Sequence, residues 1–444
     1  MLLERTAVAS LRASAIDEDE VRRDLNEAVM TFLCSRRAQL LLVLVLGVFI
    51  PSVAAWPSAE IDRFLRNPAL DNNGFNTMVG AAFAGLFGLV TFRQLRTHPG
   101  AETYTYVISA FTMSFGFLGL AYLFTRIEYA RYQLIATYVA TTIAFLVLQV
   151  MTRRHRILRL AVVPNAGNRS LPDHRSIIWI PLGEPSLGTS KVSGVVADLR
   201  ADHGPEWERF LAHCALSGLP VFHLKQAVES ITGRVDIEIL SENTLASTLH
   251  GLVYARAKRA LDLTLAVMVL PFFALLILAA AIAIRLEAPG PVFFRQVRMG
   301  HRGRPFVMWK LRSMRSDAGG AHFTTANDDR ITRVGAVIRK YRIDELPQLW
   351  NIIRGDMSWI GPRPEAAELS DWYEREVPFY SWRHIVRPGL TGWAAVNQGN
   401  VAEVDAAREK LQYDFYYIKY FSPWLDLLVV MKTIRTILTG FGSR

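Results

Sequence analysis

The sequence predicts a membrane protein with three parts: a four-transmembrane-helix bundle, a small α/β Rossmann-like middle domain, and a C-terminal domain that begins with a fifth apolar segment. Two observations indicate this class. Of the 444 residues, 51% are hydrophobic and only 20% are charged, which is too apolar for an ordinary soluble protein. Four uncharged runs of nearly membrane-spanning length follow one another, and a region of short strands and helices comes after them.

The charge and the cysteine content limit the class of function. A net charge of +10 suits anionic lipid, nucleic acid or phosphorylated substrates equally well. Two cysteines, Cys34 and Cys214, fit a reducing compartment and exclude a disulfide scaffold or a four-cysteine zinc site. The ten histidines include no pair at the spacing of zinc ligands, so a zinc hydrolase has little support.

Four apolar runs make up the predicted bundle, which we place within residues 36–155. Each run is close to the length at which a helix crosses a hydrocarbon core of roughly 30 Å, although the second is short. The runs cover about 38–56, 77–92, 104–124 and 132–151. Four such runs in succession favour membrane helices over the core helices of a large soluble protein.

Basic residues beside these runs set the expected orientation. Arginines precede the first run, lie between the second and third, and follow the fourth as a cluster of Arg153, Arg154, Arg156 and Arg159. Because cytoplasmic loops are enriched in Lys and Arg, the N-terminus and everything after Met151 are expected to face the cytoplasm. Residues 1–35 carry mixed charge without a cleavable signal peptide, which predicts a cytoplasmic N-terminal segment.

Short apolar strands alternate with a helical stretch over residues 156–245, and this alternation predicts a small parallel α/β domain. The stretch GEPSLGTSK after Pro181 looks like a phosphate-binding loop, but no lysine follows Gly188 directly. The glycine pattern of dinucleotide-binding folds is also missing from the sequence. An interaction or regulatory domain is therefore favoured over a cofactor-binding one, and residues 242–253 are expected to form a linker.

A fifth uncharged run, Thr264–Ile284, is long enough to cross the membrane. Pro271 interrupts its hydrogen-bond ladder, and both of its flanks are basic. A crossing would carry about 160 arginine-rich residues to the far side, so we favour a helix that enters the inner leaflet, bends at Pro271 and returns. A true crossing and a plain anchor are the alternatives.

The region after this run is dense in arginine and lysine, and a membrane-surface patch would account for about half of these cations. It does not account for Gly361–Pro364, where two prolines and a glycine hold Arg363 in a stiff loop that suits bidentate recognition of phosphate. Asp344 and Glu345 lie between the cations. Carboxylates repel phosphates unless a divalent cation bridges them, so Mg²⁺ is the expected partner.

The adjacent acids allow a covalent step. One of them could attack a phosphoryl group and form an acyl phosphate, which divides one transfer into two easier steps. Its neighbour could help to hold the metal or manage a proton. The residue types alone do not assign the two roles.

From Arg256 to the C-terminus, about 190 residues resemble the bacterial sugar transferases, which are monotopic polyprenyl-phosphate phosphoglycosyltransferases. The matching stretches include KRALDLTLAVMVLPFFALL, FVMWKLRSM, YRIDELPQLWNIIRGDMSWIGPRPE and VRPGLTGWAAVNQG. The four helices and the α/β region resemble the large, three-part members of this family. The resemblance implies a mostly α catalytic domain at 250–444 with a re-entrant helix at about 260–286.

The resemblance also implies roles for individual residues. Asp344 matches the family's nucleophile and would ligate Mg²⁺, and Glu345 matches its partner acid. Arg339 and Arg363 match arginines that bind phosphate. Pro271 matches the proline that breaks the re-entrant helix, although Leu270 replaces the serine that often precedes it. That serine can cap the broken backbone, so the bend in this chain is expected to depart from the family's.

The implied reaction transfers a sugar-1-phosphate, with a hexose favoured, from a UDP-sugar to undecaprenyl phosphate through an aspartyl-phosphosugar, and it releases UMP. It would be the first membrane step of exopolysaccharide, capsule or O-antigen synthesis at the bacterial inner membrane. A membrane scaffold with a decayed catalytic domain is the alternative, although the intact acids and arginines argue against it. Nucleic-acid binding lacks a reader motif.

Two further features stay open at the level of sequence. Trp382, Trp393 and Trp424 fit either anchors at the membrane interface or core packing. The middle domain could serve a homodimer.

Overall fold

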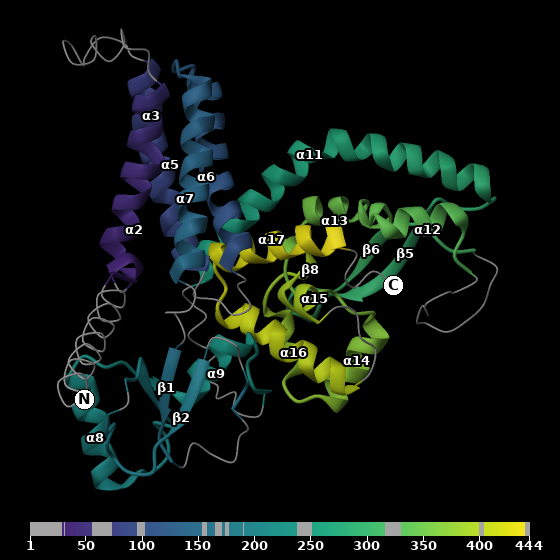
Figure 1. Ribbon diagram of the computed structural model, residues 1–444. Coiled ribbons are helices and arrows are strands. Elements are labelled where there is room, and N and C mark those ends of the chain that lie inside the picture. The colour runs from purple at the N-terminus through teal and green to yellow at the C-terminus, as the bar shows by residue number, and fades with distance from the viewer. Residues whose placement is uncertain are drawn as a thin grey trace, which may run out of the picture. The chain divides into compact units, whose positions relative to one another are not determined.

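A computed structural model describes residues 29–30, 32–55, 73–95, 103–152, 158–164, 171–173, 177–189, 191–237, 251–315, 330–398 and 404–439. The expected N-terminal segment 1–35 lies almost wholly outside the described residues, and so does most of the linker at 242–253. The chain forms two compact units, Met1–Ile231 and Thr232–Arg444 (Figure 1).

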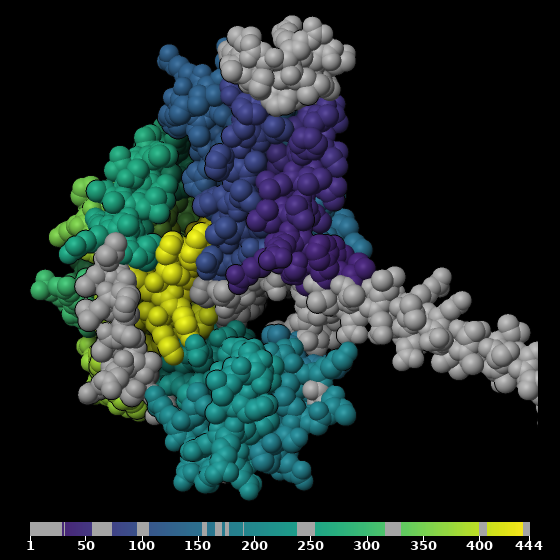
Figure 2. Space-filling model, turned by 90° about the vertical axis from the view of Figure 1, so that its left-hand side faces the viewer, coloured from purple at the N-terminus to yellow at the C-terminus, as the bar shows by residue number. Residues whose placement is uncertain are grey.

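The predicted apolar runs form four long helices in the first unit, and Figure 2 shows the purple and blue helices packed side by side. Each is long and apolar enough to cross a membrane. The first combines α2 (Arg36–Leu42), a π-helical turn (Val43–Phe49) and α3 (Ile50–Ala55). The others are α5 (Asn73–Leu95), α6 (Thr103–Thr125) and α7 (Arg131–Thr152). The prediction of four helices of membrane-spanning length is confirmed.

The bundle interior combines aromatic rings with small residues. Phe92 and Phe111 each meet Phe145 edge to face, with ring centroids 5.1 and 5.4 Å apart. A Cβ on Gly88 would lie 2.6 Å from the ring of Phe111, so only glycine permits that contact. Because lipid is as apolar as the helix faces, such close packing is what holds membrane helices together.

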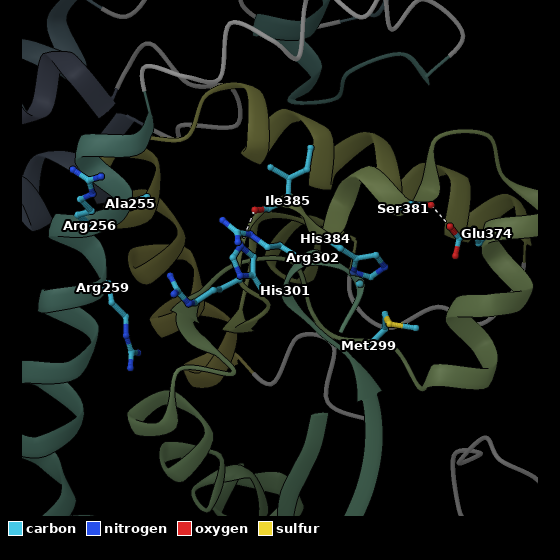
Figure 3. Close-up of a pocket in the computed structure, with 12 residues that line it drawn as sticks. Ala255, Arg256, Arg259, Met299, His301, Arg302, Glu374, Ser381, His384 and Ile385 are labelled. Atoms are coloured by element: carbon cyan, nitrogen blue, oxygen red, sulfur yellow. Dashed lines mark hydrogen bonds between the residues drawn. The ribbon is translucent and has the colours of Figure 1, made fainter. Parts of the chain in front are cut away.

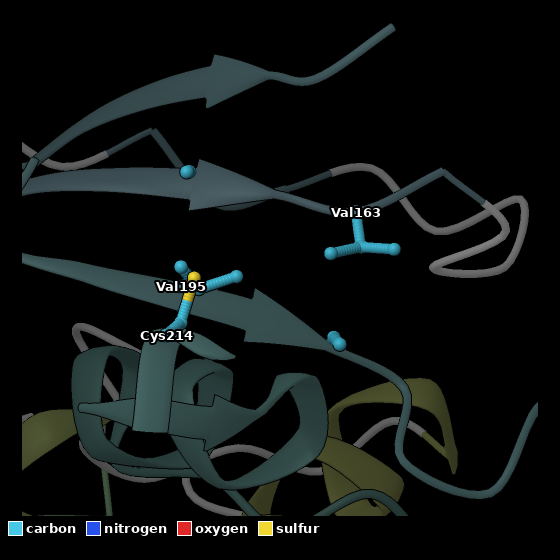
Figure 4. Packing of buried hydrophobic residues seen from close by; sticks show 5 residues of the cluster. Val163, Val195 and Cys214 are labelled. Carbon is cyan, nitrogen blue, oxygen red and sulfur yellow. The ribbon is translucent and has the colours of Figure 1, made fainter. Parts of the chain in front are cut away.

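A four-stranded parallel sheet forms the rest of the first unit. Its strand order is β2-β1-β3-β4, with bounds Leu158–Val162 (β1), Ile177–Pro181 (β2), Gly194–Ala197 (β3) and Val221–His223 (β4). Val163, Val195 and Cys214 pack together, with Cys214 supplied by α8 (Gly204–Leu216) (Figure 4). Val196 packs on α9 (Leu224–Thr232). The expected parallel α/β region is confirmed, whereas its likeness to a Rossmann fold stays a prediction.

The second unit is mostly helical, with short strands. Its helices are α11 (Gly251–Glu287), α12 (Arg333–Lys340), α13 (Gln348–Arg354), α14 (Ala367–Glu376), α15 (Trp393–Asn397), α16 (Val404–Lys419) and α17 (Pro423–Thr439). Strands β5 (Phe293–Met299) and β6 (Pro305–Leu311) form an antiparallel hairpin, and β7 (Ser358–Ile360) pairs in parallel with β8 (Gly389–Thr391).

Helix α11 is bent and lies along the rest of its own unit (Figure 1). Before Pro271, Ala266 packs with Leu349 and Ile352 of α13. After Pro271, Ala280 and Ile284 pack with Ile338 of α12 and Leu311 of β6. Both halves of the helix therefore contact the same unit.

Polar contacts fix both ends of α11. Near its start, Lys258 donates to Asp426 of α17 at 2.6 Å, and Arg259 donates to the carbonyls of Ile352 and Ile353 at the end of α13. At its end, the carboxylate of Glu287 accepts from the backbone N–H of Arg333 at 2.7 Å, in the first turn of α12. This acid at a helix N-terminus satisfies N–H groups that have no partner within the helix.

The three tryptophans can now be compared with the two roles left open. Trp393 is 2% exposed, stacks on Tyr416 and donates to the carbonyl oxygen of Gly233 at 2.9 Å. It is a core residue, so a role as an interface anchor is wrong for this tryptophan. Trp382 and Trp424 are half-buried.

Candidate active site

Asp344 and Glu345 lie in a 3₁₀ turn, Ile343–Glu345, between α12 and α13. Two features set this turn. Thr332 caps the start of α12 by accepting from the N–H of Gly335 at 2.9 Å. Arg342 has φ +54°, a left-handed conformation that ends the helix and redirects the chain. The two acids are buried, with exposed fractions of 9% and 7%, so they are not the solvent-facing pair that adjacent acids usually form.

Glu345 is surrounded by cations. Its Oε1 lies 2.5 Å from Nη2 of Arg363 and 3.7 Å from Nζ of Lys310, and its Oε2 lies 3.7 Å from Nη1 of Arg342. Burial opposes ionisation of this carboxyl, but the charges of Arg363 and Lys310 outweigh it and lower its pKa to about 2. Glu345 is therefore a charged partner of Arg363 at neutral pH.

Asp344 has the opposite environment. Burial and the neighbouring charge of Glu345 raise its pKa to about 6, against the opposing charges of Lys310, Arg339 and Arg363. No hydrogen bond to its carboxylate occurs within the part of the chain that the structure describes. Two adjacent carboxyls whose pKa values are driven apart can take different chemical roles. Of the two, Asp344 is the acid whose carboxylate accepts no hydrogen bond from the described residues.

Lys310 is a third component of the site. It lies on β6 opposite Phe294 of β5, and the hairpin places its ammonium beside Glu345. Burial lowers the pKa of Lys310 to about 8, helped by the charge of Arg363 and opposed by that of Glu345. The residue is therefore a cation at neutral pH that has lost much of its hydration, which strengthens its interaction with an anion.

Arg363 is held by the loop that contains it. The N–H of Gly361 donates to the carbonyl oxygen of Thr391 at 2.9 Å, and the N–H of Gly389 donates to the carbonyl oxygen of Pro362 at 2.9 Å. A Cβ on Gly361 would lie 2.3 Å from the carbonyl oxygen of Arg387. The two backbone segments can therefore approach each other this closely only because this residue is glycine. The sequence predicted a stiff loop, and these contacts supply its physical basis.

A second ionic network contacts the backbone of this loop. Arg383 donates to Asp414 at 2.7 Å and to the carbonyl oxygen of Arg363 at 3.0 Å. Lys410 donates to Glu365. Burial opposes ionisation of Glu365, but Lys410 and Arg383 lower its pKa to about 2. This network links α16 to the backbone of Arg363.

Comparison with known proteins identifies the family. The sequence profile of bacterial sugar transferases matches residues 253–440. The UDP-N-acetylgalactosamine-undecaprenyl-phosphate N-acetylgalactosaminephosphotransferase of Aeromonas hydrophila is 47% identical over 403 residues, which cover 90% of this chain and 94% of that protein. The chain belongs to the bacterial sugar transferase family.

Other relatives match a shorter part of this transferase. The UDP-glucose:undecaprenyl-phosphate glucose-1-phosphate transferase of Caulobacter vibrioides is 46% identical over 186 residues, or 41% of this chain and 70% of that protein. The enzyme of the same name from Escherichia coli is 39% identical over 181 residues, or 40% of this chain and 39% of that protein. The family is enzymatic, and these relatives match less than half of the transferase.

The structure brings four of the five residues singled out in the sequence close to one another. The charges of Arg339 and Arg363 act on Asp344, and Arg363 contacts Glu345 directly. Pro271 lies apart from them, within α11. The sequence did not single out Lys310, Arg383 or Glu365. For Lys310 a signal was present, because it lies in the stretch FVMWKLRSM that carries the family resemblance.

The donor set of the transferase can be tested against a magnesium ion. No group of three or more His, Cys, Asp or Glu side chains able to hold a metal occurs within the described ranges. Mg²⁺, however, often binds through one or two carboxylates together with substrate phosphates and water. Asp344 fits such a site as the single protein ligand, since Glu345 is already bound to Arg363.

Proposed function

We propose that this transferase moves a sugar-1-phosphate from a UDP-sugar to undecaprenyl phosphate and releases UMP. The observation that carries the proposal is the unequal pair of buried acids, in which Glu345 is bound to Arg363 and Asp344 has no donor within the described residues. The names of the three relatives support the substrate class, because each contains a UDP-sugar and undecaprenyl phosphate.

The first proposed step forms a covalent intermediate. A carboxylate oxygen of Asp344 attacks the phosphorus next to the sugar, and the bond from that phosphorus to the UMP oxygen breaks. UMP leaves with the bonding electrons, and Asp344 holds the sugar-phosphate as an acyl phosphate. The positive charges of Lys310, Arg339 and Arg363 act on Asp344, and they would also stabilise the phosphoryl oxygens of a group transferred to it. Mg²⁺, when bound at Asp344, would supply further neutralisation of the diphosphate.

The second proposed step regenerates the enzyme. An ionised phosphate oxygen of undecaprenyl phosphate attacks the same phosphorus, and the bond to Asp344 breaks. The carboxylate is restored, and the product is undecaprenyl-diphosphate-sugar. No proton transfer is required, because attacking and leaving oxygens are both anionic.

We propose that α11 re-enters the cytoplasmic leaflet of the bacterial inner membrane instead of crossing it. Contacts at Lys258 and Glu287 hold its two ends on the same unit, whereas a crossing helix would separate its ends by the thickness of the bilayer. Its outer face exposes large apolar side chains on both sides of Pro271, including Met268, Phe272, Leu275 and Ile282. Such an exposed apolar face needs lipid to cover it.

Thiol labelling tests this placement. In a background of Cys34→Ser and Cys214→Ala, Ala257→Cys and Pro291→Cys introduce thiols at exposed positions before and after the apolar run. We expect an impermeant thiol reagent to modify both positions from the cytoplasmic face of oriented vesicles. Labelling from opposite faces would overturn the re-entrant placement.

A donor screen tests the reaction. Purified full-length protein is incubated with undecaprenyl phosphate, Mg²⁺ and one of four donors: UDP-N-acetylgalactosamine, UDP-N-acetylglucosamine, UDP-glucose or UDP-galactose. UDP-N-acetylgalactosamine is placed first, since the relative that matches nearly the whole chain carries that sugar in its name. The hexose expected from sequence is the competing result. UMP release with any donor would exclude an inactive scaffold, and no release from folded protein would overturn the proposal.

Together these proposals place the enzyme at the first membrane step of exopolysaccharide, capsule or O-antigen synthesis. A relative that matches over 190 residues is the exopolysaccharide production protein PSS of Rhizobium leguminosarum. Loss of the surface polysaccharide on deletion of the coding sequence, with recovery by wild type but not by Asp344→Asn, would test that assignment.

A further inference from the structure

A cavity of about 890 Å³ lies in the second unit, away from the acidic pair. Its walls come from the start of α11, the turn between β5 and β6, the end of α14 and the 3₁₀ segment Tyr380–Ile385. Figure 3 shows His301 and Arg302 between Arg256 and Arg259 of α11 on one side and His384 on the other. Neither Asp344, Glu345 nor Lys310 lines it, and its volume is that of a small-ligand site.

The cavity has an excess of three positive charges. Four arginines line it (Arg256, Arg259, Arg302 and Arg387), against a single glutamate, Glu374, which accepts a hydrogen bond from Ser381. None of the four forms an ion pair with a carboxylate in the described part of the chain. Burial, with the charges of Arg387 and Arg302, lowers the pKa of His301.

Two of these arginines are fixed in place by the backbone. Arg259 donates to Ile352 at 2.6 Å and to Ile353 at 3.0 Å, and Nε of Arg387 donates to Gly355 at 3.2 Å. Neutral carbonyls orient these guanidinium groups without cancelling their charge. Pre-oriented guanidinium groups without a carboxylate at ion-pair distance suit an anion with several acceptor oxygens, and phosphate is the common example.

The same face of α11 continues as an exposed apolar stripe. The helical period places Leu263, Val267 and Leu270 in line with Arg256 and Arg259, and their exposed fractions are 40%, 54% and 39%. The distance from Arg259 to Leu270 is about 16 Å at 1.5 Å per residue, which matches one leaflet of a core roughly 30 Å thick. A ligand with a phosphate headgroup and long hydrocarbon chains would use both parts of this surface.

We propose that the cavity binds the phosphate headgroup of an anionic membrane phospholipid, whose acyl chains lie along Leu263, Val267 and Leu270. This lipid is not a substrate of the proposed reaction. The inference rests on the proposed insertion of α11 into a leaflet, but not on the phosphate transfer itself. The site would select for anionic membrane lipid and fix the depth of the transferase at the end of α11 that carries Arg256.

The test measures lipid retained by the full-length protein. Protein in detergent is exchanged against phosphatidylglycerol or phosphatidylcholine, and bound lipid is counted by native mass spectrometry. The test variant is Arg256→Gln/Arg302→Gln, whose side chains are exposed. The control, Arg304→Gln/Arg408→Gln, makes the same charge change at exposed positions outside the cavity.

We expect wild type and control to prefer phosphatidylglycerol. In the test variant this preference should fall by about 30-fold, because each cation near an anionic headgroup contributes roughly fivefold in affinity. An unchanged preference in the test variant, or an equal loss in the control, would overturn the proposal. Equal circular dichroism spectra confirm that all three proteins are folded.

Competition separates this ligand from other phosphates. Inorganic phosphate, a UDP-sugar and undecaprenyl phosphate are each added to the complex with phosphatidylglycerol. We expect none to displace it at a concentration that saturates UMP release. Displacement by the UDP-sugar or by undecaprenyl phosphate would identify the cavity as a substrate site and overturn the proposal. Because retention is measured without turnover, it can succeed or fail independently of the phosphate transfer.

Discussion

Two of the buried ionic clusters in the second unit differ in one respect. In the cluster that contacts the loop of Arg363, Asp414 is paired with Arg383, and Glu365 is paired with Lys410. In the cluster at the 3₁₀ turn, Glu345 is paired with Arg363, while Asp344 has no donor among the described residues. Evenly paired charges hold a structure together, whereas a buried acid that lacks a partner marks a place where a ligand is expected.

The largest effect that distinguishes the clusters should come from Asp344→Asn. The amide has nearly the same shape but cannot attack phosphorus, so UMP release should fall by roughly 10³-fold or more. Because ionised Asp344 is disfavoured in the folded state, unfolding stability at pH 7 should not decrease. Kinetic assay and thermal unfolding measure the two effects, and substantial turnover in this variant would refute the covalent role.

Arg383→Met should lower stability much more than activity. It leaves Asp414 and Glu365 buried without their shared cation, and breaking such a pair costs about 3–5 kcal/mol of unfolding free energy. Activity per folded molecule should decrease much less than in Asp344→Asn. Denaturant unfolding measures the loss, with Arg408→Met, an exposed arginine on α16, as the matched control. An equal loss of unfolding free energy in both variants would show that this cluster does not stabilise the fold.

The pH profile sharpens the difference between the adjacent acids. Asp344 must be ionised to attack, so the rate should rise about tenfold per pH unit up to its pKa of about 6 and then level off. Glu345, with a pKa of about 2, contributes no step in this range. The same shift in Asp344, upward from 3.8, means that its contribution to stability is fully present below pH 3.8 and is lost as the pH rises through 6.

A single-turnover assay provides the control for this profile. The acceptor phosphate has its own ionisation near pH 6, so UMP release is measured before undecaprenyl phosphate is added. If the rising limb appears only in the presence of undecaprenyl phosphate, it belongs to the acceptor and not to Asp344.

The smallest effect is expected at the helix that leads into the turn. Thr332→Ala removes the hydroxyl that accepts from Gly335 and should cost about 1 kcal/mol of unfolding free energy. Thr332→Ser retains the acceptor and should restore most of that stability in the same thermal unfolding measurement. An equal loss in both variants would show that the cap is not what Thr332 contributes.

The two clusters also differ in how far the sequence revealed them. Asp344 and Glu345 are adjacent in the chain, and Arg363 lies in a loop whose prolines and glycine indicate stiffness. The second cluster joins Arg383 to Asp414 and Glu365 to Lys410, across 31 and 45 residues, and no local pattern records such pairs. Trp393 was ambiguous for the same reason, since its partner Gly233 lies 160 residues away.

The fold shows the same division between local and distant information. Runs of apolar residues gave the four helices of the first unit, because membrane-spanning length is a local property. The placement of α11 depends on what its ends contact, and those partners lie in α12, α13 and α17. Length and apolarity therefore describe α11 and the bundle helices alike, although their surroundings differ.

The fixation of α11 has a mechanical consequence for the acids. Glu287 is hydrogen-bonded to the beginning of α12, and Arg259 is hydrogen-bonded to the end of α13. The bent helix α11 is therefore attached to both helices that flank the 3₁₀ turn. Straightening α11 would move these two contacts apart and strain the segment between α12 and α13. With α11 in one leaflet, as proposed, a thicker or thinner bilayer would displace the turn that contains Asp344 through these contacts alone.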